Sequence, residues 1–357
     1  MSTPTNGERS LRYVDALREA IAQEMDRDHS VFLFGLDVDD HNGIQGSTVG
    51  LAERFGADRV FSTPLSEDAM TGVAIGAAMA GMRPIHVHIR MDFVLLCMNQ
   101  LVNMAAKAHY MYGGQLRVPM VVRCMIGKSW GQGAQHSQGL HSMFMHVPGL
   151  KVVMPSNAYD AKGCLISAIR DDSPVIFVEH RLLYSTECHV PETAYTVEIG
   201  RARVCAAGDD ITLVGLSNMV LDCLRARDLM TDAGISAEVI DPISLTPLDI
   251  DTILDSVNRT GKLLVVDSAW TSCGASAEIL ARVAESPRVR RPVKMERMGF
   301  AVSPCPPSPP LEQAFYPDPA KIAAKAYGMV RARDFGTWVP DPERAILSHQ
   351  LQFRGPF

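Results

Sequence analysis

Residues 63–81 read TPLSEDAMTGVAIGAAMAG, which predicts a helix of small residues with one acidic side chain, Glu67, at its start. Pro64 opens the segment, Ser66 is a suitable N-cap, and Glu67 and Asp68 would lie in the first turn, where the helix dipole favours negative charge. The glycines and alanines that follow lower the intrinsic stability of the helix but let its backbone approach a neighbour closely. The pattern therefore predicts a helix packed at a crowded interface.

The acidic residue Glu67 has two interpretations. An acid in a first turn commonly does no more than complement the helix dipole. A carboxylate at the mouth of a closely packed helix can instead be buried and take part in chemistry. Both interpretations stay open at this point, and the rest of the chain bears on the choice between them.

Helical and strand-like segments alternate along the first half of the chain. Helical periodicity is found over residues 10–27, 93–110 and 158–170 and in the small-residue helix, and apolar runs typical of buried strands are found at 31–35, 84–89, 119–124, 150–154 and 174–179. Such alternation predicts an α/β fold with a mostly parallel sheet that helices cover on both faces.

A second series of the same kind follows an interruption. Residues 181–207 contain Pro191, Thr193 and Thr196 and are typical of a connection between domains. After it, strands are predicted at 211–216, 237–240 and 262–266, and helices at 220–233, 247–257 and 273–285. The proline-rich run PCPPSPPLEQ at 304–313 is predicted to be extended, and the tail from Arg333 shows no clear period.

Composition bounds the class of protein. The chain has 357 residues, 47% of them hydrophobic, which favours a large core divided between two domains. A net charge of −6 with scattered basic residues argues against a nucleic-acid partner. The eight cysteines form no CxxC pair, which predicts reduced thiols and a cytoplasmic location. We expect no membrane segment, because no apolar run approaches the ~20 residues that span a bilayer.

The segment SWGQGAQHSQ, residues 129–138, has the composition of an active-site loop. It combines Gly131 and Gly133 with a dense set of hydrogen-bonding side chains, and it follows a predicted strand, where folds of this class bind ligands. His136 could act there as a donor or acid near neutral pH. The alternative is a histidine that stabilises its own loop.

Two further features have open interpretations. His86 and His88 alternate on the strand PIHVHIR and so share a face. A zinc site is conceivable there, but zinc sites usually show tighter spacing with acidic or thiolate partners, which favours polar contacts to a substrate. Asp171 in AIRDDSP could satisfy backbone donors in its own turn, or carbonyls of that turn could hold a monovalent ion.

The chain lacks a phosphate-binding loop of a recognised kind. It contains no GDG followed some thirty residues later by NN, no GxxxxGK[ST], and no GxGxxG coupled to a strand. The chain therefore shows no obvious diphosphate-binding loop of its own.

Several motifs occur in an order and spacing that point to one family. They are TPLSE at 63–67, DF at 92–93, NQLVNMAAK at 99–107, GAQHSQ at 133–138, HVPGLKVV at 146–153, YDAKG at 159–163 and AIRDDSP at 168–174. From about residue 12 to about residue 324, the chain resembles the beta subunit of thiamine diphosphate-dependent 2-oxo acid dehydrogenases of the pyruvate and branched-chain type, in the transketolase-like superfamily.

The resemblance implies a domain organisation and a partner. It implies two doubly wound α/β domains: a transketolase-type pyrimidine-binding domain over 10–186, a linker over 187–207 and a transketolase C-terminal domain over 208–330, with a C-terminal extension over 331–357. It also implies a heterotetramer of two alpha and two beta chains. The alpha subunit would hold Mg²⁺ and the diphosphate, which would explain the missing loop.

The resemblance also assigns roles to residues. Glu67 would hydrogen-bond the aminopyrimidine of thiamine diphosphate and help shift it to the imino form, and Leu65 and Phe93 would contact the cofactor. His136 would face the substrate and the acyl acceptor, with catalytic roles thus falling on Glu67 and His136. Further candidates are His86, His88 and Gln135 for substrate, and the backbone carbonyls of Met120, Ala168, Ile169 and Asp171 for a potassium ion.

Two departures from the family pattern bear on the substrate. The family usually reads GED after the first strand, where this chain has Gly35, Leu36 and Asp37, and the family's DQ becomes Asn99 and Gln100. The resemblance favours a beta subunit that helps decarboxylate a 2-oxo acid and pass the acyl group to a lipoyl carrier. The departures and extra histidines keep two alternatives open: transketolase-like transfer of a two-carbon ketol unit from a sugar donor to a carrier protein, and a non-catalytic scaffold for an alpha-like chain.

Overall fold

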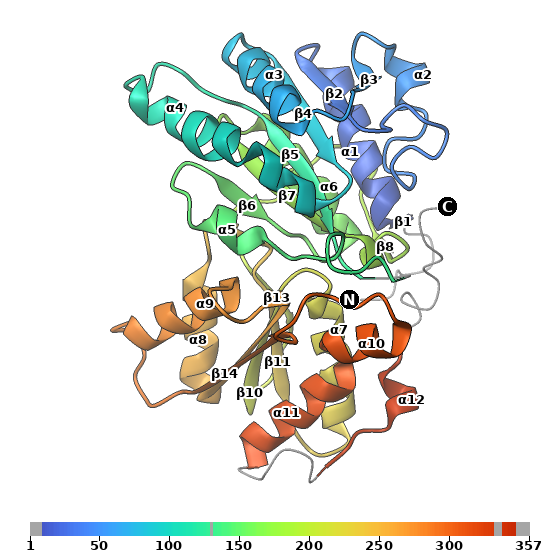
Figure 1. Cartoon of the computed structure of the whole chain (residues 1–357). Helices are drawn as coiled ribbons and strands as arrows, with labels where there is room; N and C mark the ends of the chain where they lie inside the picture. The colour runs from blue at the N-terminus through green and yellow to red at the C-terminus, as the bar shows by residue number, and fades with distance from the viewer. Residues whose placement is uncertain (1–8, 129–130, 332–337, 348–357) are drawn as a thin grey trace. The chain divides into compact units, whose positions relative to one another are not determined.

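The computed structural model describes residues 9–128, 131–331 and 338–347, and the chain divides into two compact units (Figure 1). The first unit contains the residues up to Gly127 and those from His136 to Ile199. The second contains the short segment Lys128–Gln135 and the residues from Gly200 onward.

The first unit is built on a parallel sheet. Six of its strands lie in the order β6-β7-β5-β4-β2-β3 and span Lys151–Val153, Val175–His180, Val121–Ile126, Arg83–His88, Val31–Gly35 and Val60–Ser62. Every residue of β2, β5 and β7 is buried; β2 is a continuous apolar run, whereas β5 contains Arg123 and β7 contains Glu179 and His180 among apolar residues.

Helices cover both faces of this sheet (Figure 1). Helices α1 (Tyr13–Arg27) and α6 (Ala158–Arg170) pack together on one face, and α3 (Glu67–Met79) lies on the other. The short helices of the unit are α2 (Leu51–Phe55), α5 (His141–Met145) and the 3₁₀ turn η3 (Arg181–Leu183). This is the doubly wound arrangement that the alternating pattern predicts.

The predicted helix over 93–110 is three helical segments of different winding. It begins as the 3₁₀ helix η1 (Met91–Cys97), continues as the π-helix η2 (Asn99–Ala105) and ends as α4 (Ala106–Met111). Apolar periodicity identifies a helical segment but does not distinguish these windings. Long 3₁₀ and π segments are uncommon and are often found at functional sites. The unusual winding therefore indicates that the region after β4 is a candidate functional region.

The second unit repeats the design with a five-stranded sheet. Its strands lie in the order β14-β13-β10-β11-β9 and span Lys294–Phe300, Lys262–Trp270, Ile211–Gly215, Ala237–Asp241 and Arg203–Ala206, with only β9 antiparallel to its neighbour. Helices α7 (Met219–Thr231) and α11 (Pro319–Arg331) bury an apolar cluster against one face. The unit also contains β12 (Ser244–Thr246), α8 (Ile250–Thr260) and α9 (Ala275–Glu285).

Two predicted irregular segments contain regular structure. The segment 187–207 includes β9 and also β8 (Glu187–His189), which pairs antiparallel with β1 (Ser10–Arg12), so it is more than a linker. The proline-rich run is not extended throughout, because α10 (Pro309–Phe315) begins within it. Prolines are tolerated in a first helical turn, whose amides have no partner in the helix.

Part of the predicted C-terminal extension is helical as well. Within 331–357, the described residues include α12 (Pro342–Ala345), while 332–337 and 348–357 lie outside the described residues.

A fully buried ion pair stabilises the first unit. The Arg123 guanidinium donates to both carboxylate oxygens of Glu179, at 2.6 and 2.9 Å, and the Tyr184 hydroxyl donates to the same carboxylate at 2.6 Å. Both charged side chains are 0% exposed. Such a pair is costly to break singly, since the remaining charge would be left buried without its partner.

We therefore expect Arg123→Met to lower the free energy of unfolding by about 3–5 kcal/mol. The double variant Arg123→Met/Glu179→Leu should recover most of that loss, because it leaves no unpaired charge. Denaturant unfolding followed by circular dichroism measures both, and a double variant that is no more stable than the single one would contradict this account.

Candidate active site

Three segments that follow the parallel strands β3, β4 and β5 meet at the carboxyl end of the first sheet. Glu67 begins α3 soon after β3, η1 follows β4, and the loop containing His136 follows β5. Parallel strands end at the same edge of a sheet, which is where ligands bind in folds of this kind. The geometry around η1 shows how the three segments are connected.

Glu67 is held by its backbone rather than by a cap. Ser66 stands at the N-cap position, but its side chain makes no capping hydrogen bond. The Cys97 thiol at the end of η1 donates to the Glu67 carbonyl oxygen at 3.2 Å. Burial raises the pKa of Cys97 to about 11, so the thiol stays protonated and able to donate.

Glu67 is half-buried, which leaves both interpretations of this acid open. The small-residue face of α3 has open space at two positions within the described chain: a Cβ added at Gly72 or Gly76 would meet nothing within 4 Å. Leu65, just before the helix, is 78% exposed. The chain alone therefore does not supply the crowded interface that we expect around this helix.

Phe93 and His136 lie side by side. Their rings contact edge to face, with centroids 5.4 Å apart and an interplanar angle of 75°. Phe93 is 36% exposed, so its ring forms part of the protein surface in this single chain. The structure thus brings together two of the predicted site residues, and Cys97 links their neighbourhood to Glu67.

Polar contacts fix the chain on both sides of His136. One carboxylate oxygen of Asp92 accepts from the Gln138 side-chain amide at 2.8 Å and from the Gln138 backbone N–H at 3.3 Å. The buried Arg181 guanidinium donates to the His136 carbonyl oxygen at 3.1 Å. The sequence analysis assigns no role to Asp92, Gln138 or Arg181. Of the three, only Asp92 could have been found, because it is the acid of the DF motif.

Glycines allow the loop to approach its neighbours. Gly127 and Gly131 both have positive φ, at 110° and 69°. A Cβ at Gly127 would collide with the His180 ring, and one at Gly131 would collide with the Pro307 carbonyl oxygen. Ser129 and Trp130 of the predicted loop lie outside the described residues, and Gln135, which is exposed, stays a predicted substrate contact.

His86 and His88 share a face, as predicted, but they are sealed inside the protein. His86 stacks on Phe34 with centroids 4.5 Å apart, and the two histidine rings lie 4.3 Å apart. The Thr71 hydroxyl of α3 lies 3.4 Å from His86 Nδ1. The two rings are only 2% and 4% exposed in this chain, which does not favour a contact with substrate, and that role stays a prediction.

Burial also determines the charge of these histidines. Desolvation lowers the pKa of His86 well below its ordinary value, with a further contribution from His88, and lowers the pKa of His88 to about 4. Both rings are therefore neutral at physiological pH. Across the described residues, no group of three or more His, Cys, Asp and Glu side chains is arranged to hold a metal, so the zinc alternative gains no support.

The carbonyls predicted to surround potassium already accept hydrogen bonds. Those of Ile169 and Asp171 accept from the Arg83 guanidinium, each at 3.0 Å. Those of Met120 and Ala168 accept from backbone N–H groups at 2.9 and 3.3 Å. Because a cationic side chain contacts two of the four oxygens, the set as arranged does not fit a potassium ion, and we assign it no step.

The Asp171 side chain accepts a hydrogen bond from a backbone donor in its own turn, which is the first of the two interpretations given for it. Its Oδ1 accepts from the Ser173 backbone N–H at 2.8 Å, so the carboxylate satisfies a donor in its own turn. Its other oxygen forms an ion pair with Lys151.

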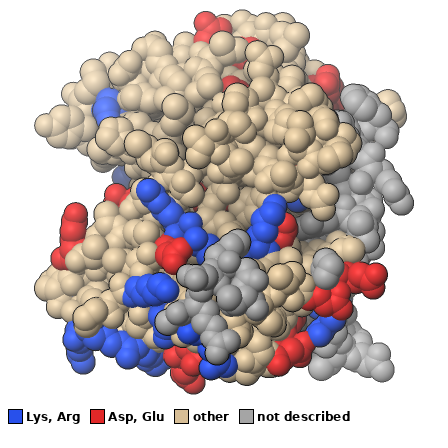
Figure 2. All heavy atoms as spheres, turned by 60° about the horizontal axis from the view of Figure 1, so that its bottom comes forward, with Lys and Arg blue, Asp and Glu red and all other residues tan. Residues whose placement is uncertain are grey.

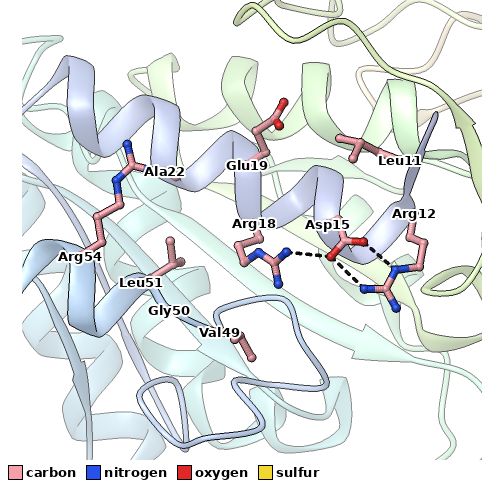
Figure 3. Close-up of a pocket in the computed structure, with 10 residues that line it drawn as sticks. All are labelled: Leu11, Arg12, Asp15, Arg18, Glu19, Ala22, Val49, Gly50, Leu51 and Arg54. Carbon is pink, nitrogen blue, oxygen red and sulfur yellow. Dashed lines mark hydrogen bonds and ion pairs between the residues drawn. The ribbon is translucent and has the colours of Figure 1, made fainter. Parts of the chain in front are cut away.

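A hollow of about 500 Å³ lies away from these residues, between α1 and the segment that leads into α2 (Figure 3). Its charges are paired with one another or with nearby side chains: Asp15 contacts both Arg12 and Arg18, and Arg54 pairs with Asp26. None of the predicted site residues lines this hollow, so we do not place the reaction there.

Comparison with known proteins identifies both units. Residues 9–186 match the family model for the transketolase pyrimidine-binding domain, and residues 200–322 match that for the transketolase C-terminal domain. Among solved structures, a split-gene transketolase described as an inactive beta4 tetramer matches with a TM-score of 0.74 and 19% identity, over 91% of this chain and all of that one. At that identity, the likeness concerns the fold alone.

Curated relatives are considerably more similar. The beta subunit of acetoin:2,6-dichlorophenolindophenol oxidoreductase from Cupriavidus necator is 44% identical over 328 residues, covering 89% of this chain and 97% of that protein. The beta subunit of the pyruvate dehydrogenase E1 component from Rickettsia bellii is 44% identical over 269 residues, covering 75% of this chain and 83% of that protein.

The buried histidines predict a specific loss of stability in acid. Because the pKa of His88 is about 4 in the folded chain and near 6.5 when exposed, the unfolded state binds more protons between these values. Stability should therefore fall as the pH drops below about 6.5. Between pH 7 and pH 5, His88→Phe should lose less unfolding free energy than the wild type, by on the order of 1–2 kcal/mol. His29→Phe, at an exposed position, is the matched control.

The close approach of Gly131 to Pro307 predicts that substituting two loop glycines by alanine lowers stability by unequal amounts. Gly131→Ala and Gly133→Ala both place a side chain at positive φ, but only the first collides with backbone; at Gly133 the nearest atom lies 3.7 Å from the added Cβ. Gly131→Ala should therefore cost about 1–3 kcal/mol more. Thermal denaturation and amide hydrogen exchange of residues 131–138 measure the difference, and equal effects would show that the contact is not restrictive.

Proposed function

This chain belongs to the family of beta subunits of thiamine diphosphate-dependent 2-oxo acid dehydrogenases, and from that membership we propose that it helps decarboxylate a 2-oxo acid and transfer the acyl group to a lipoyl carrier. The observation that carries the proposal is the convergence of Glu67, Phe93 and His136 around η1 at the carboxyl end of the sheet.

The residues present fit the pyrimidine half of thiamine diphosphate. When bound, this cofactor supplies the carbanion chemistry, and the protein binds, orients and desolvates it. The half-buried Glu67 carboxylate would hydrogen-bond the aminopyrimidine, and the exposed side of Phe93 would pack against it. His136, which contacts Phe93, would hold or deliver a proton near the substrate.

An exposed apolar surface supports a partner chain. Val73 of α3, Leu96 of η1 and Met111 of α4 are 53%, 59% and 66% exposed, and these helical segments contact one another in series (Figure 1). Contiguous exposed apolar side chains are typical of protein–protein interfaces. An alpha subunit that covers this surface in an α2β2 heterotetramer would complete the half-open site around Glu67 and would bring the diphosphate loop and its Mg²⁺.

The surface charge bears on the kind of partner, and the thiols support a reducing compartment. On the face shown in Figure 2, basic and acidic side chains are intermixed rather than gathered by sign, which does not favour nucleic acid. All eight cysteines are thiols that form no disulfide, in keeping with a cytoplasmic location. No helix in the described part of the chain has both the length and the apolar character needed to cross a bilayer.

Oxidation of acetoin is the second candidate function. It is favoured by the Cupriavidus acetoin oxidoreductase subunit, which matches this chain at 44% identity over 97% of its length. Ketol transfer from a sugar donor and a scaffold role remain outcomes of the test. The convergence of Glu67 and His136 disfavours the scaffold, because a scaffold has no need of either side chain.

The first test is turnover by this chain co-purified with its alpha partner, thiamine diphosphate and Mg²⁺. Pyruvate, branched 2-oxo acids, acetoin and a ketose phosphate are offered in parallel. CO₂ release from an oxo acid supports the proposal. Consumption of acetoin or ketose without CO₂ would assign the chain to the corresponding alternative, and no turnover with intact assembly would favour the scaffold.

Glu67→Gln should lower kcat by roughly 100-fold or more, because the amide cannot exchange a proton with the aminopyrimidine. Asp68→Asn, the next acid in the same helical turn and exposed, is the matched control and should keep near-normal rates. Size-exclusion chromatography checks that both variants still assemble. Near-normal turnover by Glu67→Gln would show that the cofactor assignment is wrong.

A further inference from the structure

We propose that Asp92 is a positioning residue that holds His136 in place through Gln138. The inference rests on the proposed function, since it concerns the histidine of that site. It adds a residue that does not itself touch the cofactor or the substrate.

The contact between Asp92 and Gln138 closes the loop onto η1. A single Asp92 oxygen accepts both the side-chain amide and the backbone N–H of Gln138. Because the backbone N–H takes part, the contact fixes the path of the chain two residues after His136, and not merely one side chain. Asp92 is only 7% exposed, so water has little access to compete for these hydrogen bonds.

A second contact fixes the same segment from another element. Arg181 of η3 follows β7, is 1% exposed, and donates to the His136 carbonyl oxygen at 3.1 Å. The backbone at His136 is thus held by η3, and the chain just beyond it is held by η1. Both ends of this short segment are fixed, and the imidazole of His136 contacts the Phe93 ring in an edge-to-face arrangement.

The same 3₁₀ helix carries the contacts to the other site residues. Phe93 follows Asp92 directly, and Cys97 at the end of η1 donates to the Glu67 carbonyl oxygen. Three side chains of one seven-residue element therefore set the relative positions of Glu67, Phe93 and His136. Of the three, Phe93 contacts the His136 ring, and Asp92 is the one that hydrogen-bonds the backbone of the histidine loop.

The electrostatics explain why a buried acid suits this position. Burial raises the pKa of Asp92, and the two hydrogen bonds from Gln138 offset only part of this rise. Arg90 is the other charged group that interacts with it. A buried carboxylate is costly unless its oxygens are hydrogen-bonded, so the contact to Gln138 also stabilises Asp92 itself.

The test is a double-mutant cycle in the assembled enzyme with its alpha partner. Asp92→Ala should lower kcat by about 10- to 100-fold, since small misplacements of a catalytic group have effects of this size. Gln138→Met should lower it less, because the backbone N–H remains. The double variant should be no worse than Asp92→Ala alone. Asp92→Asn, which keeps the acceptor, should recover to within a few-fold of wild type.

Two further measurements separate positioning from a general structural role. The apparent KM for thiamine diphosphate should stay within about twofold in all variants, as Glu67 and Phe93 are not displaced. Glu53→Ala, at an exposed acid on α2, should leave every parameter unchanged. Additive losses in the cycle, or a parallel loss of cofactor affinity, would overturn the proposal.

A readout that does not depend on turnover separates this inference from the proposed function. Amide hydrogen exchange at Gln138 should be faster in Asp92→Ala and close to wild type in Asp92→Asn. If the wild-type enzyme turns over no substrate, this exchange pattern still supports the contact, whereas unchanged exchange at Gln138 in Asp92→Ala overturns it. If Asp92→Ala does not assemble, the kcat values of Gln138→Met and Asp92→Asn are compared instead. A lower kcat for Gln138→Met than for Asp92→Asn supports the contact, and equal values overturn it.

Discussion

The parallel alignment of β2, β3, β4 and β5 is the constraint on which the candidate site depends. Parallel strands all end at one edge, and each must be followed by a segment that leaves that edge, so residues distant in sequence meet there. Glu67, Phe93 and His136 come from three such segments. None of the three side chains belongs to a strand. The order of the strands in the sheet determines which segments meet, and the site is a consequence of that order.

Much of this arrangement could be predicted from the sequence, because it follows from local patterns. Buried parallel strands are continuous apolar runs, and Val31–Gly35 and the helix Ala158–Arg170 have the predicted bounds. Glu67, Phe93 and His136 belong to motifs whose residues are contiguous. The family match confirms the two transketolase-type domains, while the roles of individual site residues remain proposals.

What could not be predicted depends on contacts between distant segments. The bond between Asp92 and Gln138 joins residues on different loops, and nothing in either motif specifies it. The sealed position of His86 and His88 depends on α3 lying over their face of the sheet, which alternation along one strand does not reveal. Similarly, Arg83 contacts the carbonyls of Ile169 and Asp171 only because β4 begins beside the turn that ends α6.

The protonated thiol beneath Glu67 has a chemical consequence for the site. Cysteines react with alkylating agents and peroxides as thiolates, and a pKa of about 11 leaves almost no thiolate at Cys97 near neutral pH. The side chain is also 0% exposed. Cys97 therefore acts as a hydrogen-bond donor that resists oxidation, so the thiol that contacts the Glu67 backbone does not make the site sensitive to redox stress.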